Sequence, residues 1–205
     1  MRTVVHLVRH GEVHNPDGLL YGRAPGFALS RAGHAMAARA AAALAGGDVV
    51  ALVSSPLQRA QETAAPLAEQ LGLDVELDDR LTEAHHVLEG RRVDMHRSIL
   101  RQPRVWPTLW NPWRPSWGEP YRDVVRRMTA AVDDARAAAR GHEVVLVSHE
   151  APIWVTRRHA EGRRLAHLPR RREVGLGSLT SLHFEDDDLV DVGYDALEHT
   201  AGPTA

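Results

Sequence analysis

The stretch VVHLVRHGE, residues 4–12, is an apolar run that ends abruptly in Arg9, His10, Gly11 and Glu12. Four apolar or β-branched residues within five positions are typical of a strand covered on both faces. The C-terminal end of this strand carries a cation and an imidazole, and ligands of open α/β sheets bind outside the carboxyl ends of the strands. Taken alone, Arg-His-Gly fits a solvated strand end with a turn glycine equally well.

Two more apolar runs end in polar side chains. DVVALV, residues 48–53, precedes two serines and a predicted helix whose first turn contains Arg59. EVVLVSH, residues 143–149, ends in His149. If the three strands are parallel, their polar ends meet at one edge of the sheet.

The helix after the second run has a well-marked predicted start. Ser55 and Gln58 fit a capping box, and Pro56 fits the first helical position, where a missing N–H costs nothing. We expect Pro66 to kink or interrupt this helix.

Strand and helix patterns alternate along the chain. An alanine-rich helix is predicted over 31–45 and a second long helix over 121–140. Residues 75–77 are expected to form a short strand, and residues 178–194 a hairpin around an acidic turn. The alternation predicts an α/β fold, a three-layer α/β/α sandwich with a mostly parallel central sheet and an antiparallel edge strand.

At 205 residues, a single domain over 1–205 is the simplest division. Within it we expect 90–118 to be an insertion near the active site, because PRVWPTLWNPWRPSWGEP, residues 103–120, holds four of the five tryptophans. Its rings could cover one end of the sheet or wall a substrate pocket. The same segment could pack on a second copy, so a homodimer stays open. Residues 195–205 are expected to be frayed.

The composition excludes several classes of protein. The chain has no cysteine and no lysine, so all 25 basic residues are arginine. Disulfides, thiolate metal sites, Schiff-base chemistry and Walker-type phosphate loops are therefore excluded. A formal net charge of −2 gives no reason to expect nucleic acid as a partner. No stretch approaches the roughly 20 apolar residues that cross a bilayer, so we expect no membrane partner and a cytoplasmic location.

The three strand ends together describe a site for a dianion. Two arginines, two histidines and a helix N-terminus converge on one point if the strands are parallel. Guanidinium groups match phosphate oxygens in pairs, and a helix N-terminus adds free N–H donors. The sequence therefore predicts a phosphate site at this edge.

An ordered set of motifs makes the prediction specific. LVRHGE, SSPLQRAQETA, RLTEAHHVLEG, GEPYRDVVRRM and VLVSH, in this order and at these intervals, resemble the histidine phosphatase superfamily, which includes cofactor-dependent phosphoglycerate mutases and many small phosphatases. The resemblance covers residues 4–153. It implies a nucleophilic His10 that forms phosphohistidine, phosphate contacts from Arg9, Arg59 and His149, and Glu83 as the general acid. The chemistry so implied needs no metal and no cofactor.

These roles suit the chemistry of the residues. A neutral imidazole is a suitable attacker, because a phosphate ester is close to dianionic near neutral pH and repels an anionic nucleophile. The other ring nitrogen of His10 should donate to a backbone carbonyl, which fixes the tautomer. We expect His149 to be protonated and to hold phosphate oxygens. Glu83 can protonate the leaving alkoxide only if burial or neighbouring anions raise its pKa.

Three more residues are candidates for substrate contacts. Asn15 stands five residues beyond His10, whereas many members of that family have a phosphate-binding asparagine six residues beyond. Glu150 stands where many have glycine after the second histidine, so its carboxylate either points away or binds a cationic part of the substrate. Arg23 could reach a second anionic group or lie in solvent.

Two other patterns are better explained by ordinary structure. The arginines within residues 157–172 predict a solvated basic surface, because Trp154 is the one nearby aromatic residue that could stack on a base. His85 and His86 with Glu89 do not suggest a metal site, because adjacent residues on a helix do not share a face.

The sequence as a whole predicts a metal-independent phosphatase of small phosphorylated metabolites. A phosphoglycerate mutase-type phosphotransferase is the alternative, although a mutase must hold a carboxylate and two phosphoryl positions, and the Trp/Pro-rich segment stands where extra basic contacts would be sought. A non-catalytic phospholigand-binding module is the second alternative, because a change such as Glu150 could abolish turnover.

Overall fold

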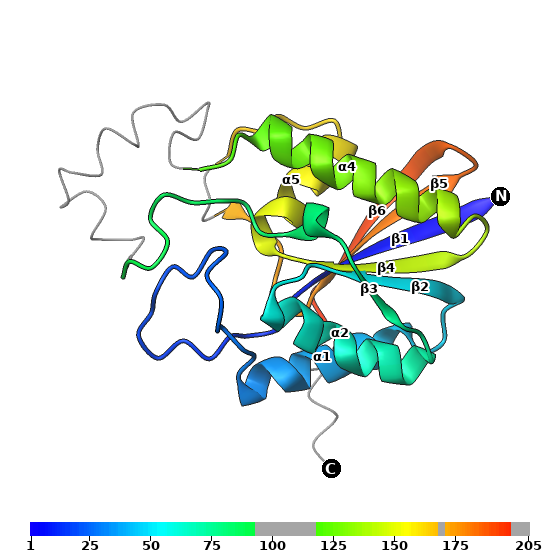
Figure 1. Ribbon diagram of the computed structural model, residues 1–205. Helices are drawn as coiled ribbons and strands as arrows, with labels where there is room; N and C mark the ends of the chain where they lie inside the picture. The colour runs from blue at the N-terminus through cyan, green and yellow to red at the C-terminus, as the bar shows by residue number, and fades with distance from the viewer. Residues whose placement is uncertain (93–117, 168–170, 198–205) are drawn as a thin grey trace, which may run out of the picture.

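The computed structural model describes residues 1–92, 118–167 and 171–197, and within them a six-stranded sheet forms the centre of the molecule (Figure 1). In the order β3-β2-β4-β1-β5-β6 the strands lie side by side. Their bounds are β1 (Arg2–Arg9), β2 (Val49–Ser54), β3 (Val75–Leu77), β4 (Glu143–Ser148), β5 (Leu179–Glu185) and β6 (Asp188–Asp195). The first four pair in parallel, whereas β5 is antiparallel to β1 and β6 to β5. The predicted mostly parallel sheet with an antiparallel hairpin at its edge is confirmed.

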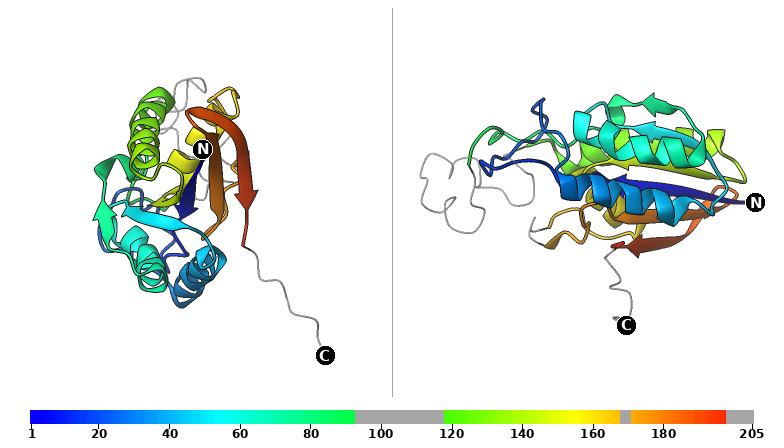
Figure 2. Two further views of the ribbon diagram at one scale, coloured as in Figure 1. Left: turned by 90° about the vertical axis from the view of Figure 1, so that its right-hand side faces the viewer. Right: turned by 90° about the horizontal axis from the view of Figure 1, so that it is seen from below.

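Helices cover both faces of the sheet. The helical segments are α1 (Arg31–Leu44), α2 (Gln58–Leu71), the short 3₁₀ helix η1 (Asp79–Leu81), α4 (Tyr121–Ala138) and α5 (Glu150–Ala160). On one face α1 and α2 pack around residues such as Leu44 and Leu67, and on the other α4 and α5 pack around Met128 and Trp154. In the right-hand view of Figure 2, α1 and α2 lie in front of the sheet. The predicted three-layer sandwich is confirmed.

The start of α1 follows the sequence signal. Ser30 is the N-cap, and its Oγ accepts a hydrogen bond from the Gly33 N–H at 3.0 Å. A serine oxygen in this position satisfies one of the N–H groups that have no partner within the helix. This cap ties the entry of α1 to the segment that follows β1, because the Ser30 hydroxyl donates to Glu12 Oε1 at 2.6 Å.

The predicted start of α2 is wrong, and Pro66 does not end the helix. The helix begins at Gln58 with Leu57 as N-cap and no side-chain cap, so Pro56 precedes the helix and no capping box forms. Ser55 Oγ instead lies 2.8 Å from Nε2 of His149, so this contact competes with the local cap. Pro66 does not interrupt the helix, which continues to Leu71.

The helix α5 was not predicted. It begins at Glu150, immediately after the third strand end, with His149 as its N-cap. Pro152 lies in its first turn, where a missing N–H costs little, and Arg157 lies in its last turn. These are ordinary start and stop signals, so the sequence carried the information for this helix.

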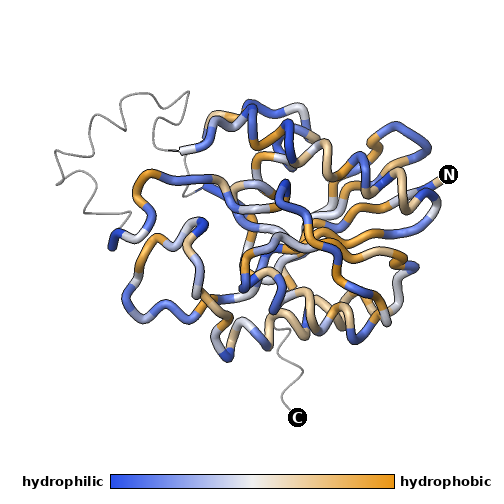
Figure 3. The backbone as a smooth tube through the Cα atoms, viewed as in Figure 1, coloured by the Kyte–Doolittle hydropathy of each residue, from blue (hydrophilic) through white to orange (hydrophobic). Residues whose placement is uncertain are grey.

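The apolar and hydrophilic residues of the chain are distributed as the sandwich requires. Figure 3 shows apolar residues concentrated in the central strands, whereas the loops beyond β1 contain long hydrophilic stretches. Most of the predicted Trp/Pro-rich insertion, residues 93–117, and the end of the predicted frayed tail, residues 198–205, lie outside the described residues. Of the helices in the described part of the chain, none has the length and apolar character needed to cross a membrane.

Candidate active site

The parallel register brings the three predicted strand ends to one edge of the sheet. Arg9 at the end of β1 pairs with Ser148 at the end of β4, and the His10 N–H donates to the Ser148 carbonyl at 3.1 Å. The Ser55 N–H, just past β2, donates to the Val147 carbonyl at 2.9 Å. As a result the rings of His10 and His149 lie 5.1 Å apart between centroids.

His10 is held as a neutral imidazole with a defined tautomer. Its Nδ1–H donates to the Gly11 carbonyl at 2.7 Å, as expected, so the lone pair is on Nε2, which accepts from Arg59 Nε–H at 3.3 Å. The side chain is buried, at 1% exposure. Burial lowers the pKa of His10 well below its ordinary value of 6.5, and the charges of Arg59 and Arg9 lower it further. The ring is therefore neutral and can act as a nucleophile.

Arg59 is the second member of the site, in the first turn of α2. It is as buried as His10, and besides its bond to His10 it donates from Nη2 to the Gly22 carbonyl at 2.7 Å. Its guanidinium lies 4.7 Å from the centre of the Tyr21 ring. The loop that follows β1 thus folds back over the arginine and orients it toward the nucleophile.

His149 is fully buried at the end of β4. Its Nε2 lies 2.8 Å from Ser55 Oγ, and its buried Nδ1 has no hydrogen-bond partner among the described residues. Burial lowers the pKa of His149 well below 6.5, and the neighbouring His10 and Arg59 lower it further. This shift favours the neutral ring, and the protonated form stays a prediction for the site with phosphate bound. A dianion against it would raise the pKa again.

Arg9, at the end of β1, forms an ion pair with the carboxylate of Glu150. Its Nη1 donates to the Val174 carbonyl, and its Nη2 lies 2.7 Å from Glu150 Oε2. The other oxygen of Glu150 is 3.4 Å from Nη1 of Arg172. Glu150 therefore points neither away from the site nor at a substrate cation, because it bridges two arginines, one of them the predicted phosphate ligand.

Glu83 has the property that its predicted role requires. Burial raises the pKa of its carboxyl above the ordinary value of 4.5 and outweighs the hydrogen bond that Oε1 accepts from the Ala84 N–H at 2.7 Å. The charge of Arg172 also lowers the pKa of Glu83, and that of Glu150 raises it. The charge of Arg59 lowers it as well, so Glu83 lies within electrostatic reach of residues on both sides of the site.

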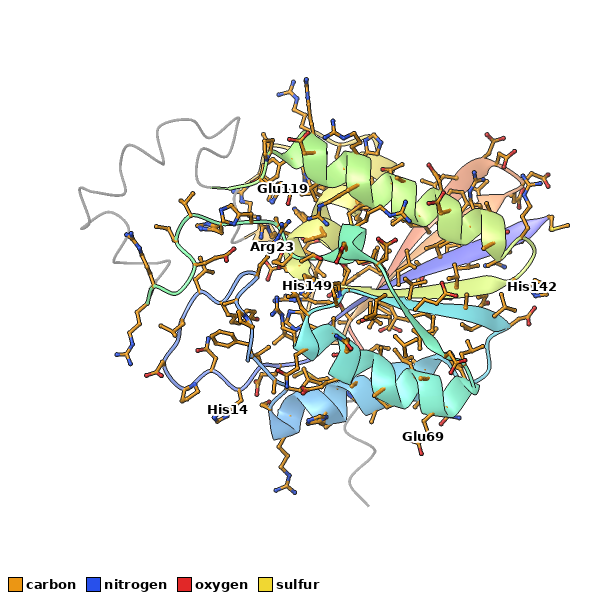
Figure 4. The ribbon with its side chains drawn as sticks, in the orientation of Figure 1. His14, Arg23, Glu69, Glu119, His142 and His149 are labelled. Atoms are coloured by element: carbon orange, nitrogen blue, oxygen red, sulfur yellow. The ribbon has the colours of Figure 1, made fainter. Side chains whose placement is uncertain are left out.

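Asn15 and Arg23 have contacts that do not support phosphate binding. The Asn15 amide closes a turn, because its Nδ2 donates to the Leu19 carbonyl at 2.8 Å and its Oδ1 accepts from the Leu19 N–H at 3.0 Å. Arg23 donates from Nε to the Glu83 carbonyl at 2.6 Å and from Nη2 to Glu119 Oε2 at 2.9 Å. Figure 4 shows Arg23, Glu119 and His149 at the same end of the sheet, opposite His142.

Sequence reasoning missed three residues of this site, namely Tyr21, Ser55 and Arg172. Arg172 was assigned to a solvated basic surface, yet its side chain is only 15% exposed and it donates from Nε to His167 Nε2 at 3.0 Å. Ser55 was assigned to a helix cap. Its place directly after an apolar strand, like that of His10 and His149, was the signal that could have identified it.

The comparisons with known proteins agree with this geometry. The family model for the histidine phosphatase superfamily (branch 1) matches residues 5–194. The uncharacterised protein Rv0525 of Mycobacterium tuberculosis is 58% identical over 192 residues, which cover 94% of this chain and 95% of that protein. GpmB of Yersinia pestis, named as a probable phosphoglycerate mutase, is 29% identical over 207 residues, with 98% and 93% covered. The mycobacterial glucosyl-3-phosphoglycerate phosphatase Rv2419c superposes with a TM-score of 0.76 at 26% identity, with 95% and 98% covered.

Proposed function

The chain belongs to the histidine phosphatase superfamily, and we propose that it is a metal-independent phosphatase of small phosphorylated metabolites that works through a phosphohistidine at His10. The observation that carries this proposal is the state of His10, a buried neutral imidazole whose lone pair on Nε2 faces Arg59. A lone pair aimed at a guanidinium is where a phosphoryl group would be both held and attacked.

The first chemical step transfers the phosphoryl group to the enzyme. His10 Nε2 forms a bond to phosphorus while the ester P–O bond breaks. Arg59 Nε–H, which donates to Nε2 at 3.3 Å, exchanges this bond for one to a phosphate oxygen. Glu83, whose raised pKa keeps it protonated to higher pH than an ordinary carboxyl, gives its proton to the leaving oxygen.

The second step releases phosphate. Water attacks phosphorus, the N–P bond breaks, and His10 returns to its neutral form. The Glu83 carboxylate takes the proton from the attacking water, so that the acid is restored and inorganic phosphate leaves. Arg9 and His149 would bind the phosphoryl oxygens in both steps, and the buried, unpartnered Nδ1 of His149 is suited to this role within the part of the chain described by the structure.

The charge of the pocket favours a phosphatase over a mutase. Both activities occur in the names of similar proteins. A mutase must hold a second phosphoryl position and a carboxylate, which calls for additional cationic groups. Glu150 instead neutralises part of the charge of Arg9 and Arg172. A site with its positive charge reduced in this way suits a substrate with a single phosphate group. The phosphohistidine is then hydrolysed by water rather than by a second hydroxyl group of the substrate.

Hydrolysis of para-nitrophenyl phosphate in EDTA tests the proposal. We expect turnover by the wild type that is lost, by at least about a thousandfold, in His10→Ala. Turnover that requires added metal would contradict metal independence, and equal turnover by both proteins would contradict the role of His10. No turnover by either protein, with vanadate still bound, would favour the closed pocket of a mutase or a non-catalytic phospholigand-binding module.

A further inference from the structure

The main chain around Glu83 is anchored on both sides. Four backbone carbonyls between Arg80 and His85 accept hydrogen bonds from α4, from β4 and from two connecting segments. The donors are Arg127 Nη1 to the Arg80 carbonyl, Ser148 Oγ to Leu81 at 2.6 Å, Arg23 Nε to Glu83 at 2.6 Å and the Glu119 N–H to His85 at 3.0 Å. A segment held in this way presents its one carboxyl group in a fixed direction.

Two of these anchors depend on a single carboxylate. Glu119 accepts from Arg23 Nη2 at 2.9 Å, and it forms a bidentate pair with Arg127, with Nε to Oε1 at 2.9 Å and Nη2 to Oε2 at 3.1 Å. Figure 4 shows Arg23 and Glu119 close together at the end of the sheet where His149 lies. Glu119 therefore orients the two arginines that hold the backbone before and at Glu83.

The charge state of Glu119 suits this arrangement. Burial raises the pKa of its carboxyl, but the hydrogen bonds from Arg127 and the charges of Arg127 and Arg23 outweigh burial, and the pKa ends below its ordinary value. Glu119 and Arg127 are both largely buried, whereas Arg23 is 40% exposed. Without the carboxylate, Arg23 would have little reason to stay on the Glu83 carbonyl, since an exposed arginine gains side-chain entropy in solvent.

We infer that Glu119 is a positioning residue for the general acid Glu83, acting through Arg23 and Arg127. This inference rests on the proposed function, because it assumes that Glu83 protonates a leaving alkoxide. A misplaced acid harms the departure of a poor leaving group far more than that of a good one, since a good leaving group needs little protonation. The dependence of the rate on the leaving group is therefore the property that Glu119 should control.

The test compares Glu119→Gln with the wild type on two substrates, glycerol 2-phosphate with an alkoxide leaving group and para-nitrophenyl phosphate with a phenolate. The quantity measured is kcat/KM, which includes the steps up to the departure of the alcohol. We expect Glu119→Gln to lower kcat/KM about tenfold on glycerol 2-phosphate and less than about twofold on para-nitrophenyl phosphate. Arg23→Ala, at a more exposed position, should show the same contrast.

The chain offers a matched control. Glu161 also accepts from two arginines, Arg157 Nε at 2.8 Å and Arg163 Nη1 at 3.0 Å, but it lies at the far end of α5. Glu161→Gln should leave the ratio of the two kcat/KM values unchanged. Partial unfolding cannot imitate the expected result, because a ratio of two rates does not depend on the fraction of active enzyme.

A double-mutant cycle completes the test. If Glu119 acts only through the acid, Glu119→Gln should cost nothing further on glycerol 2-phosphate in a Glu83→Gln background. Equal losses on both substrates, or fully additive losses with Glu83→Gln, would overturn the inference and leave the proposed function intact. Failure of the wild type to hydrolyse either substrate would overturn the proposed function itself.

Discussion

In the proposed mechanism, His10 and Glu83 have opposite protonation requirements. His10 must be neutral to attack, and Glu83 must be protonated to donate. Burial meets both requirements, because it disfavours the charged form of each group and so lowers the pKa of His10 and raises the pKa of Glu83. One physical cause thus shifts the pKa of each group in the direction that the proposed first step needs.

The pH dependence of turnover should show both groups. Below the lowered pKa of His10 the nucleophile is protonated, and above the raised pKa of Glu83 the acid is lost, so kcat/KM for glycerol 2-phosphate should form a bell. Glu83→Gln should remove the alkaline limb and keep the acidic one. An alkaline limb that survives unchanged in this variant would show that Glu83 is not the general acid.

Glu150 should weaken the binding of phosphate. Its carboxylate lies 2.7 Å from Arg9 Nη2, so it competes with phosphate oxygens for the same guanidinium and repels them. We expect Glu150→Gln to lower the inhibition constant of vanadate or inorganic phosphate by roughly 3- to 10-fold. Glu173→Gln, an exposed position between α5 and β5, should have no effect. Unchanged or weaker inhibition of Glu150→Gln would show that the carboxylate does not compete.

Among the elements, the strands were more predictable than the helix starts. An apolar run such as VVHLV is typical of a central parallel strand that is covered on both faces. Because the carboxyl ends of parallel strands lie at one edge of the sheet, three polar strand ends were enough to predict where the candidate site lies. The start of α2 could not be predicted, because Ser55 bonds to His149 from a distant strand end. A tertiary contact of this kind overrides a local capping signal.

Gly33 shows how α1 constrains the nucleophile loop. A Cβ at Gly33 would lie 2.0 Å from the Glu12 carbonyl, and a Cβ at Gly11 would lie 2.4 Å from the Gly33 carbonyl. Gly33→Ala should therefore push the segment after His10 away from α1, lower the melting temperature by several degrees and reduce kcat more than tenfold.

Gly46 provides the control for this substitution. A Cβ at Gly46 meets nothing within 4 Å among the described residues. Gly46→Ala should leave the melting temperature and turnover close to those of the wild type. A Gly33→Ala variant that behaves like Gly46→Ala would mean that the loop after β1 adapts freely and that its close packing on α1 is not needed.

Over the whole molecule, the residues of the candidate site that stand at strand ends could be predicted from the sequence. The residues that reach the site from connecting segments could not. Arg9, His10, Arg59 and His149 follow strands or begin a helix, so their convergence follows from the topology. Tyr21 and Arg172 come from connecting segments, whose paths are decided by contacts such as Tyr21 against Arg59 and Arg172 against Glu150. Such contacts leave no periodic signal in the sequence.

Several partly or fully buried histidines should make the folded molecule sensitive to mild acid. Burial lowers the pKa of His86 and of His167 to about 4, and those of His10 and His149 well below 6.5. Below pH 6.5 the unfolded chain binds protons that the folded chain does not, so stability falls as pH falls from 6.5 toward 4. The raised pKa of Glu83 has the opposite effect, because its folded form binds a proton more tightly than the unfolded chain does. Glu83 is one group, whereas these four histidines are shifted the other way.

Thermal unfolding at pH 7 and pH 5 measures this effect. The melting temperature should be lower at pH 5, and the difference should shrink in His86→Gln/His167→Gln, which removes two of the shifted groups. His159→Gln, at an exposed position of α5, is the control. A difference that stays the same in the double variant would show that these two imidazoles do not charge on unfolding.

The most direct test of the central claim is the chemical identity of the intermediate. The wild type is mixed with para-nitrophenyl phosphate in EDTA, quenched in alkali, where phosphohistidine survives, and analysed by intact and peptide mass spectrometry. We predict one phosphoryl group per chain on the peptide that contains His10, and none in His10→Ala. Continued turnover with no phosphorylated chain, or with the phosphoryl group on another residue, would contradict the account.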